Sequence, residues 1–353
     1  MRKVKFTLMR KLIIILSLII TSYYLDAQIG GTRTFMFLDL PNSARNTALG
    51  GENPAISDEN NAFYNPATID SNYINRLSAS YVNYFAGIKW GYSSYTLSIP
   101  KAGNFIVGIQ YLNYGKFIAA DEAGNITGDF YASDYTMNFG WQYRFDSSFT
   151  GGIILKPIFS SYERYTSFGL AADFALNYTS KNQYFKTSLI FRNVGSQIKP
   201  YIPQNYEKLP FDIRIGIHQR LPHSPFAFSI VLHHLNILNL GYTKPQTSSY
   251  SYLEQTQPKA IEKFADLSMR HLIAGIEIIP SEHFYVSLGY NYQRRQELKL
   301  NTKSELVGFS AGVGIRIKKF SINYGISRYH IAGVMHIFTF SFDLNNFYKK
   351  HTR

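Results

Sequence analysis

Apolar and polar residues alternate along many segments between Arg76 and Leu344. In the clearest segment, apolar residues take the odd positions and mostly polar residues take the even ones: Tyr135, Met137, Phe139, Trp141, Tyr143 and Phe145 against Asp134, Thr136, Asn138, Gln142 and Arg144. A period of two predicts β-strands with one apolar and one polar face. Such strands suit a transmembrane barrel, whose outer face meets lipid while its inner face meets a wet lumen. A soluble β-sandwich alternates in the same way, so topology has to separate the two classes.

The alternation predicts fourteen strands, at 76–86, 88–100, 103–114, 132–145, 148–160, 165–180, 183–194, 209–221, 225–239, 270–279, 282–294, 306–318, 319–328 and 336–344. The connections after even-numbered strands are tight, at 100–104, 146–148, 180–182, 222–225, 280–282 and 318–319. Most connections after odd-numbered strands are longer, at 115–131, 195–208, 240–269, 295–305 and 329–335. Outer-membrane barrels close with an even number of strands and place their short turns in the periplasm. We therefore expect an all-β, 14-stranded antiparallel transmembrane β-barrel with both termini in the periplasm.

The N-terminal residues have the pattern of a secretory signal peptide. Basic residues up to Lys11 precede an apolar run from Leu12 to Ile20, and Ala27 supplies a small residue for cleavage. No later stretch approaches the roughly 20 apolar residues that a transmembrane helix needs. The chain has no cysteine, which excludes disulfides, thiolate chemistry and a lipoprotein anchor. The expected organisation is a signal peptide over 1–27, an N-terminal hatch or plug segment over 28–75, the barrel over 76–344 and a basic periplasmic tail over 345–353.

The segment 28–75 does not alternate, which sets it apart from the strands. Pro41 and Ser43 are start signals for a short helix through Arg45 to Leu49, and Gly50-Gly51 ends it. Fourteen strands enclose a lumen too wide for inward side chains alone to fill. We therefore expect this polar segment to enter the barrel and plug it.

Ionisable residues on the polar faces of the predicted strands form a set of luminal charges: Asp134, Arg144, Lys186, Arg192, Asp212 and Arg214. Such residues serve either as a charge network that braces the plug or as a proton relay. Arg45 in the plug is expected to pair with Asp212 or Asp134.

Composition agrees with an outer-membrane barrel. Aromatic residues make up 16% of the chain, with 28 Tyr and 27 Phe, as expected for girdles at the two membrane interfaces. The net charge of +13 falls to about +9 without the signal peptide. That excess either steers the surface toward anionic lipopolysaccharide and outer-membrane lipid or reflects luminal and turn charges. Because the cations are scattered, nucleic acid is a poor candidate for a partner.

The sequence shows no catalytic motif, cofactor motif or metal-ligand spacing. It lacks a Gly-x-Ser-x-Gly elbow, a His-Glu-x-x-His pair and a phosphate-cradling glycine loop. His233 and His234 are adjacent in a predicted strand, so their side chains face opposite sides and do not chelate one metal. Asp121, Asn125 and Asp129 bring oxygens to one loop, but their spacing departs from the EF-hand, and an ordinary polar loop is the simpler interpretation. We expect no enzyme and no cofactor.

Three short motifs before the first strand resemble the N-terminal hatch of the FadL-type barrel superfamily: Ser43-Ala44-Arg45, the run ending in Gly50-Gly51, and Asn65-Pro66-Ala67. More specifically, the chain resembles an outer-membrane barrel family of the Bacteroidetes type IX secretion system. The segments that carry this resemblance are 38–45, 81–84, 108–115, 124–130 and 289–298. The likeness extends from about Gly31 to Leu344, except for 243–265.

The resemblance implies a non-catalytic role in a cell-surface attachment complex. Similar proteins sit there with a sortase-like protease, a second FadL-type barrel that carries cargo, and a surface propeller-type protein. That complex joins secreted cargo to anionic lipopolysaccharide, and the barrel is expected to anchor the propeller-type partner. Transport of a hydrophobic compound, as in the wider superfamily, is the main alternative, and a membrane-embedded hydrolase is a third.

The longest connection between strands contains a potential docking helix. Ile261, Phe264 and Leu267 lie at near-helical spacing, which predicts a short amphipathic helix whose apolar side needs cover. Exposed aromatic residues are enriched at interfaces. The residues proposed to dock the partner are Tyr250, Tyr252, Ile261, Phe264, Arg294 and Arg295. The alternative is a loop that folds back over the mouth of the barrel.

Overall fold

The computed structural model describes residues 33–51, 53–58, 60–69, 73–241, 260–298, 306–330 and 333–345. Within these ranges the chain forms fourteen strands: β1 Arg76–Asn83, β2 Lys89–Ile99, β3 Gly103–Ala120, β4 Ile126–Arg144, β5 Phe149–Tyr162, β6 Tyr165–Thr179, β7 Phe185–Lys199, β8 Asp212–Arg220, β9 Phe226–Leu232, β10 Leu272–Ser281, β11 Phe284–Asn291, β12 Phe309–Ile317, β13 Phe320–His330 and β14 Gly333–Asp343. The predicted signal peptide and the tail beyond Asn345 lie outside the described residues.

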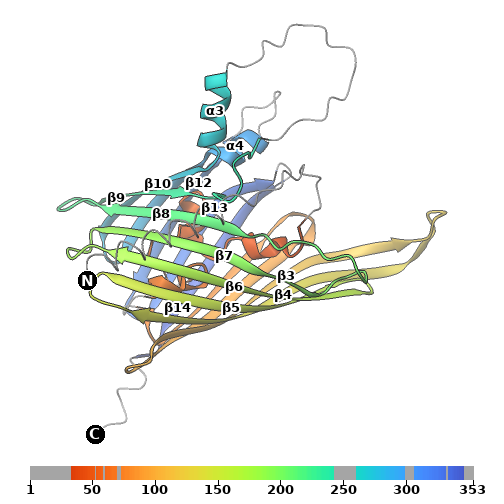
Figure 1. Cartoon of the computed structure of the whole chain (residues 1–353), viewed down its shortest axis with the longest axis horizontal. Helices are drawn as coiled ribbons and strands as arrows, with labels where there is room; N and C mark the ends of the chain where they lie inside the picture. Colours follow the sequence, from red (N-terminus) through yellow and green to blue (C-terminus); the bar gives the residue numbers. More distant parts are fainter. Residues whose placement is uncertain are drawn as a thin grey trace, which may run out of the picture. The chain divides into compact units, whose positions relative to one another are not determined.

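The strands form a closed antiparallel barrel (Figure 1). Each strand pairs with its neighbours in the chain, and β1 closes the ring by pairing with β14 from Arg76 opposite Asp343 to Asn83 opposite His336. The expected all-β barrel of fourteen strands is therefore confirmed.

Strand β4 shows why the period of two predicts this fold. Met137 and Phe139 are 52% and 46% exposed on the outer face, whereas Thr136 and Asn138 are buried on the inner face. Because side chains alternate across a strand, the outer wall is apolar and the inner wall is polar.

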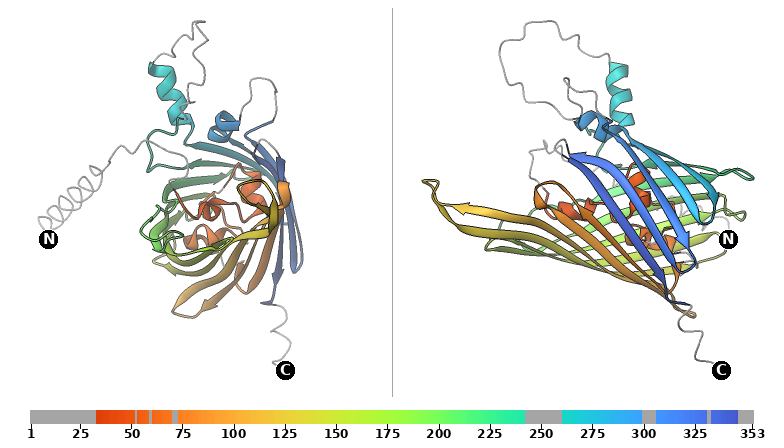
Figure 2. Two further views of the ribbon diagram at one scale, coloured as in Figure 1. Left: turned by 90° about the vertical axis from the view of Figure 1, so that its right-hand side faces the viewer. Right: turned by 180° about the vertical axis from the view of Figure 1, so that it is seen from behind.

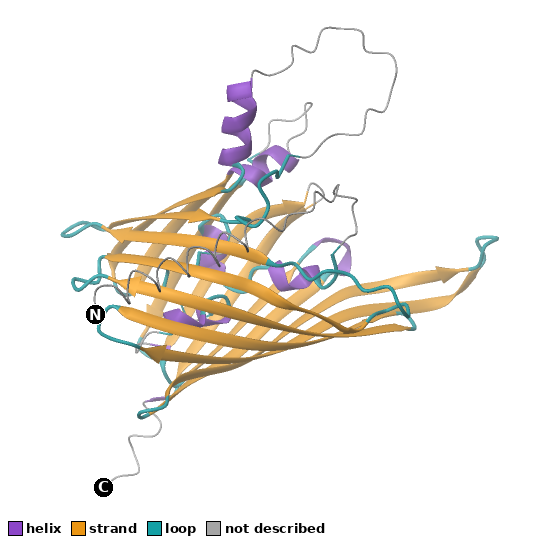
Figure 3. Ribbon diagram, in the orientation of Figure 1, coloured by secondary structure: helices purple, strands orange, loops and turns teal. Residues whose placement is uncertain are grey.

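Helices in the described part of the chain are short: η1 Met36–Asp39, α2 Ala44–Ala48, η2 Asn61–Phe63, η3 Pro66–Thr68, η5 Phe85–Gly87, α3 Ala260–Met269 and α4 Tyr292–Leu298, where η marks a 3₁₀-helix. None of the helices described has both the length and the apolar character needed to cross a bilayer. As Figure 3 shows, they belong to the segment before β1 and to connections between strands.

The predicted loop at 115–131 is wrong, because β3 and β4 continue as a long hairpin to a turn at 121–125 (Figure 1). Lys116 pairs with Asp129 across this hairpin, with 2.7 Å between Nζ and Oδ2. The register shifts around Gly115, which has φ 89°. This bulge interrupts the period of two, so the sequence pattern ended the strand too early.

Other predicted boundaries also need correction: β1 ends at Asn83, β7 continues to Lys199, β8 begins at Asp212, β9 ends at Leu232, β11 ends at Asn291 where α4 begins, β12 begins at Phe309, and only 331–332 separate β13 from β14. The connections after β7, β9 and β11 remain long. All three follow odd-numbered strands, so they lie at the same end of the barrel.

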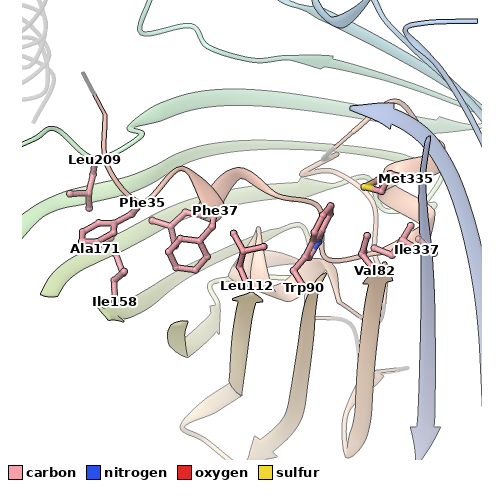
Figure 4. Close-up of a cluster of buried hydrophobic side chains, with 12 residues drawn as sticks. Phe35, Phe37, Val82, Trp90, Leu112, Ile158, Ala171, Leu209, Met335 and Ile337 are labelled. Carbon is pink, nitrogen blue, oxygen red and sulfur yellow. The ribbon is translucent and has the colours of Figure 1, made fainter. Parts of the chain in front are cut away.

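The residues described between 33 and 75 lie inside the ring of strands, as the end-on view in Figure 2 shows. Their apolar side chains pack against the inner wall. Phe35 and Phe37 point toward Ile158 and Leu112 in the main buried cluster (Figure 4). Farther along the cluster, Trp90 Nε1 donates a hydrogen bond to the Pro41 carbonyl at 3.1 Å.

Candidate functional site

The contact between the N-terminal segment and the inner wall is the candidate functional site, and α2 is its centre. Ser43 is extended and caps α2, accepting a hydrogen bond from Asn46 N at 3.4 Å. Ala44 N donates to Thr339 Oγ1 of β14 at 3.0 Å. The helix expected from the start signals therefore forms, and it packs on β11 to β14.

Two glycines end α2 where the backbone meets the wall. Gly50 and Gly51 have φ 95° and 144°, a region that side chains rarely allow. A Cβ added to Gly50 would lie 2.6 Å from Ile273 Cγ2. A Cβ added to Gly289 of β11 would lie 2.1 Å from Gly50 N. Backbone packs on backbone here, with no room for a side chain.

The Asn65-Pro66-Ala67 motif makes a second contact with the wall. The Asn65 side chain caps η3 by accepting from Ala67 N at 2.9 Å, and Pro66 takes the first helical position. The Ala67 carbonyl accepts hydrogen bonds from Gln142 Nε2 and Thr150 Oγ1, both at 2.7 Å. The motif therefore ties the segment to β4 and β5.

Arg45, which is partly buried, forms a bidentate ion pair with the buried Glu277 of β10. Its Nε lies 2.8 Å from Glu277 Oε1, and its Nη2 lies 3.0 Å from Oε2. Ser287 Oγ donates to Glu277 Oε1 at 2.9 Å. The predicted partners, Asp212 and Asp134, are wrong. Because α2 packs on β11 to β14, its first turn faces the adjacent β10.

A second set of charges holds η1 against the opposite wall. Arg192 Nη1 and Arg214 Nη2 each lie 3.6 Å from Asp39 Oδ1. Arg192 Nη2 also donates to the Leu38 carbonyl at 2.9 Å, and Arg214 Nε lies 2.5 Å from Asp212 Oδ2. These strand charges converge on the segment within the lumen.

Sequence reasoning missed Asp39, Lys156, Asp173 and Glu277. Lys156 and Asp173 are fully buried and lie 2.5 Å apart between Nζ and Oδ2. Lys156 Nζ also lies 3.3 Å from Asn193 Oδ1. The signal was present, because each of the three strand residues occupies an inward position in the period of two.

Asp134 does not contact Arg45, and phenol groups surround it instead. Its Oδ2 accepts hydrogen bonds from Tyr114 OH at 2.6 Å and Tyr162 OH at 2.9 Å, and its Oδ1 accepts one from Ser160. This cluster joins β3, β4 and β5 at the inner wall.

The two other predicted luminal charges lie apart from these pairs. Lys186 Nζ donates to Ser57 Oγ of the segment at 2.9 Å. Arg144 is exposed at the end of β4. Of the two, Lys186 therefore contributes to holding the segment.

Helix α3 forms where the near-helical spacing predicts it. Ile261 and Phe264 are 81% and 73% exposed. Arg270 Nε pairs with Asp266 Oδ2 at 2.8 Å, and Tyr292 OH of α4 donates to Asp266 Oδ1 at 2.9 Å. The helix thus presents apolar side chains while its C-terminal end is tied to the strand connections. The other docking residues in this loop, Tyr250 and Tyr252, lie outside the described residues.

The two arginines proposed for docking make contacts within the chain. The Arg294 guanidinium lies 3.7 Å from the centre of the Tyr329 ring, and its Nη1 donates to Ser327 Oγ at 3.1 Å. Arg295 Nη1 donates to the Val307 carbonyl at 3.4 Å. These contacts fasten α4 to β13 and to the connection before β12.

His233 and His234 lie beyond the end of β9 with their ring centres 4.7 Å apart, so the prediction that their side chains face opposite sides of a strand is wrong. Across the residues that the structure describes, no three His, Cys, Asp or Glu side chains are grouped to hold a metal. The Asp121 carboxylate instead accepts hydrogen bonds from Ala123 N and Asn125 N at 3.0 and 2.8 Å. A hydrogen bond from the Asn125 side chain and these backbone bonds lower the pKa of Asp121. The carboxylate closes the hairpin turn.

No protein-family model matches this chain, and no curated protein matches it. Among solved structures, the Ralstonia pickettii toluene transporter TbuX is similar with a TM-score of 0.52 and 11% identity, over 87% of this chain and 99% of that one. The Pseudomonas putida toluene transporter TodX is similar with a TM-score of 0.51 and 13% identity, over 86% of this chain and 97% of that one. The chain therefore shares the barrel fold of these two proteins.

Proposed function

We propose that this chain is a non-catalytic outer-membrane barrel of the type IX secretion system, similar to PorQ, which anchors a surface partner of the attachment complex. The observation that carries the proposal is the exposure of Ile261 and Phe264 on α3, at 81% and 73%. An amphipathic helix with an uncovered apolar side is a common docking element. The segments that resemble the type IX barrel family support the same role.

The paired charges in the lumen also support an anchor. Glu277, Arg192 and Lys156 are each 1% exposed or less, and all are engaged by charged or polar partners. A site for an apolar compound is expected to be lined mostly by apolar groups. In this proposal the N-terminal segment closes the lumen and supports the barrel. The loops after odd-numbered strands face outward, and both termini are periplasmic.

The test is affinity purification from native membranes of the tagged barrel and of two α3 variants. Ile261→Glu with Phe264→Glu should reduce the co-purified surface protein at least about tenfold, because charge replaces the docking surface. Lys263→Glu changes an exposed residue on the same helix and serves as the control. Equal recovery of the partner with all three proteins, or no stoichiometric partner of the unaltered barrel, would overturn the anchor.

Transport of a hydrophobic compound is the second candidate, and the fold comparisons favour it over the secretion role. The two solved structures compared above are toluene transporters. Under this proposal, the N-terminal segment would gate a path through the barrel. Purified full-length barrel in lipid vesicles should then accelerate toluene uptake, and an anchor with a sealed lumen should not.

Removing the segment tests whether it closes the barrel, which both roles assume. Deletion of 33–69 should raise conductance in a planar bilayer by at least about tenfold, because fourteen strands leave a wide lumen. The full-length chain is the control. Small and unchanged conductance after the deletion would show that the segment does not close the barrel.

A further inference from the structure

The outer wall of the barrel carries an apolar hollow of about 790 Å³ over β9 to β14. Two small residues of the outer face, Ala274 of β10 and Ala311 of β12, lie among its lining residues. In the strand register, Ala274 lies opposite Tyr290, while Ala311 lies between Leu288 and Ile326. Small side chains beside large ones leave a depression in the wall.

The floor of the hollow is sealed from the lumen. Its lining includes Gly275 and Gly289, whose inner sides face the end of α2. A Cβ on Gly275 would lie 2.8 Å from Leu49 Cδ2, and one on Gly289 would lie 2.1 Å from Gly50 N. The N-terminal segment therefore backs the floor directly, and a ligand reaches the hollow from the membrane side.

The lining residues of the hollow lie at different levels along the barrel. Arg328 is the cation among its described lining residues, and none of those residues is acidic. It lies two residues before the end of β13, at the end of the barrel that carries the long connections. Ile276 and Phe228, which pair across β10 and β9, line the hollow farther from that end. Arg328 therefore lies toward the outer end of the hollow, where Leu306 and Val334 also line it, and apolar side chains continue below.

We propose that this hollow binds an acyl chain of lipopolysaccharide from the outer leaflet, with Arg328 next to a phosphate of the headgroup. A lipid of that leaflet has its anionic group outermost and its chain directed inward, which matches the order of the lining. The volume lies within the range of about 300–1,000 Å³ typical of ligand pockets. A guanidinium is well suited to phosphate, and an apolar depression to hydrocarbon.

The first test fills the hollow. The full-length barrel, with Ala274→Phe and Ala311→Phe together, is reconstituted into nanodiscs of phosphatidylethanolamine, phosphatidylglycerol and rough lipopolysaccharide. Lipopolysaccharide retained per barrel after detergent extraction is then measured by native mass spectrometry. The filled variant should retain at least about tenfold less than the unaltered barrel, because two phenyl rings occupy the site. Ile322→Phe is the control, because Ile322 is an exposed apolar residue that does not line the hollow.

The second test keeps the shape and removes the charge, so it does not depend on the filled variant assembling. Arg328→Gln should weaken retention about tenfold for phosphorylated lipopolysaccharide. It should have little effect with dephosphorylated lipid. Equal retention by the Arg328→Gln, filled and control barrels would overturn the proposal. So would retention of phospholipid alone, or loss of a bound protein in place of lipid from the filled variant.

Discussion

The N-terminal segment is held differently by the two sides of the barrel. Toward β11 to β13 the contact is steric, since a Cβ on Gly289, Gly312 or Gly325 would lie 2.1 to 2.6 Å from atoms of the segment. Toward β7 and β8 the contact is electrostatic, with Arg192 and Arg214 directed at Asp39. Arg45 adds an ion pair at the margin of the steric side.

The two sides of the barrel differ in the substitutions that they tolerate. Where backbone packs on backbone there is no space for a side chain, so any added methyl group disturbs the contact. A buried ion pair depends on both partners, so removal of one leaves an uncompensated charge. The steric side fixes how closely the segment approaches, and the charged side makes its detachment costly.

The largest effect is expected from breaking one buried pair. Arg45→Ala should lower the free energy of unfolding by about 3–5 kcal/mol, because Glu277 would remain buried without its partner. The measurement is the urea midpoint of the barrel in detergent micelles. Arg45→Met combined with Glu277→Met should recover most of the loss. If the single variant is as stable as the parent, the ion pair between Arg45 and Glu277 does not hold the segment in place.

A smaller effect is expected on the steric side. Gly289→Ala should cost about 1–3 kcal/mol through overpacking against Gly50. The matched control is the same substitution in the barrel that lacks 33–69, where the opposing backbone is absent and the cost should largely vanish. An equal loss of stability in the full-length and the deleted barrel would mean that the substitution disturbs β11 itself and not its contact with Gly50.

The smallest effect is expected from protonating the exposed carboxylate of Asp121. The pKa of Asp121 is lowered, so its turn is stabilised above its ordinary pKa of about 4 and loses that stabilisation as the pH falls further. Hydrogen exchange at the Ala123 and Asn125 amides, corrected for intrinsic rates, should become faster in acid. Glu122→Gln should leave this profile unchanged. A pH-independent profile would mean that the carboxylate does not hold the turn.

The sequence patterns predict the structural features that depend on residues close together in the chain. The alternation around Met137 predicts β4, and the cap at Ser43 predicts α2. The partner of Arg45 was not predictable in this way, because Glu277 lies 232 residues away and several inward acids were equally suitable. Bulges that interrupt the period, such as the one at Gly115, hid the true ends of strands.

The pairing of β1 with β14 dictates an order of assembly. Asn75 and Asn345 are hydrogen-bonded across 270 residues, so the ring is complete only after the last strand has arrived. Non-local closure of this kind is slow. The segment inside the ring precedes β1 in the chain, and a finished barrel would have to admit it through an end. We therefore expect the segment to be enclosed as the strands gather around it, so that β1 and β14 close the ring with the segment already inside.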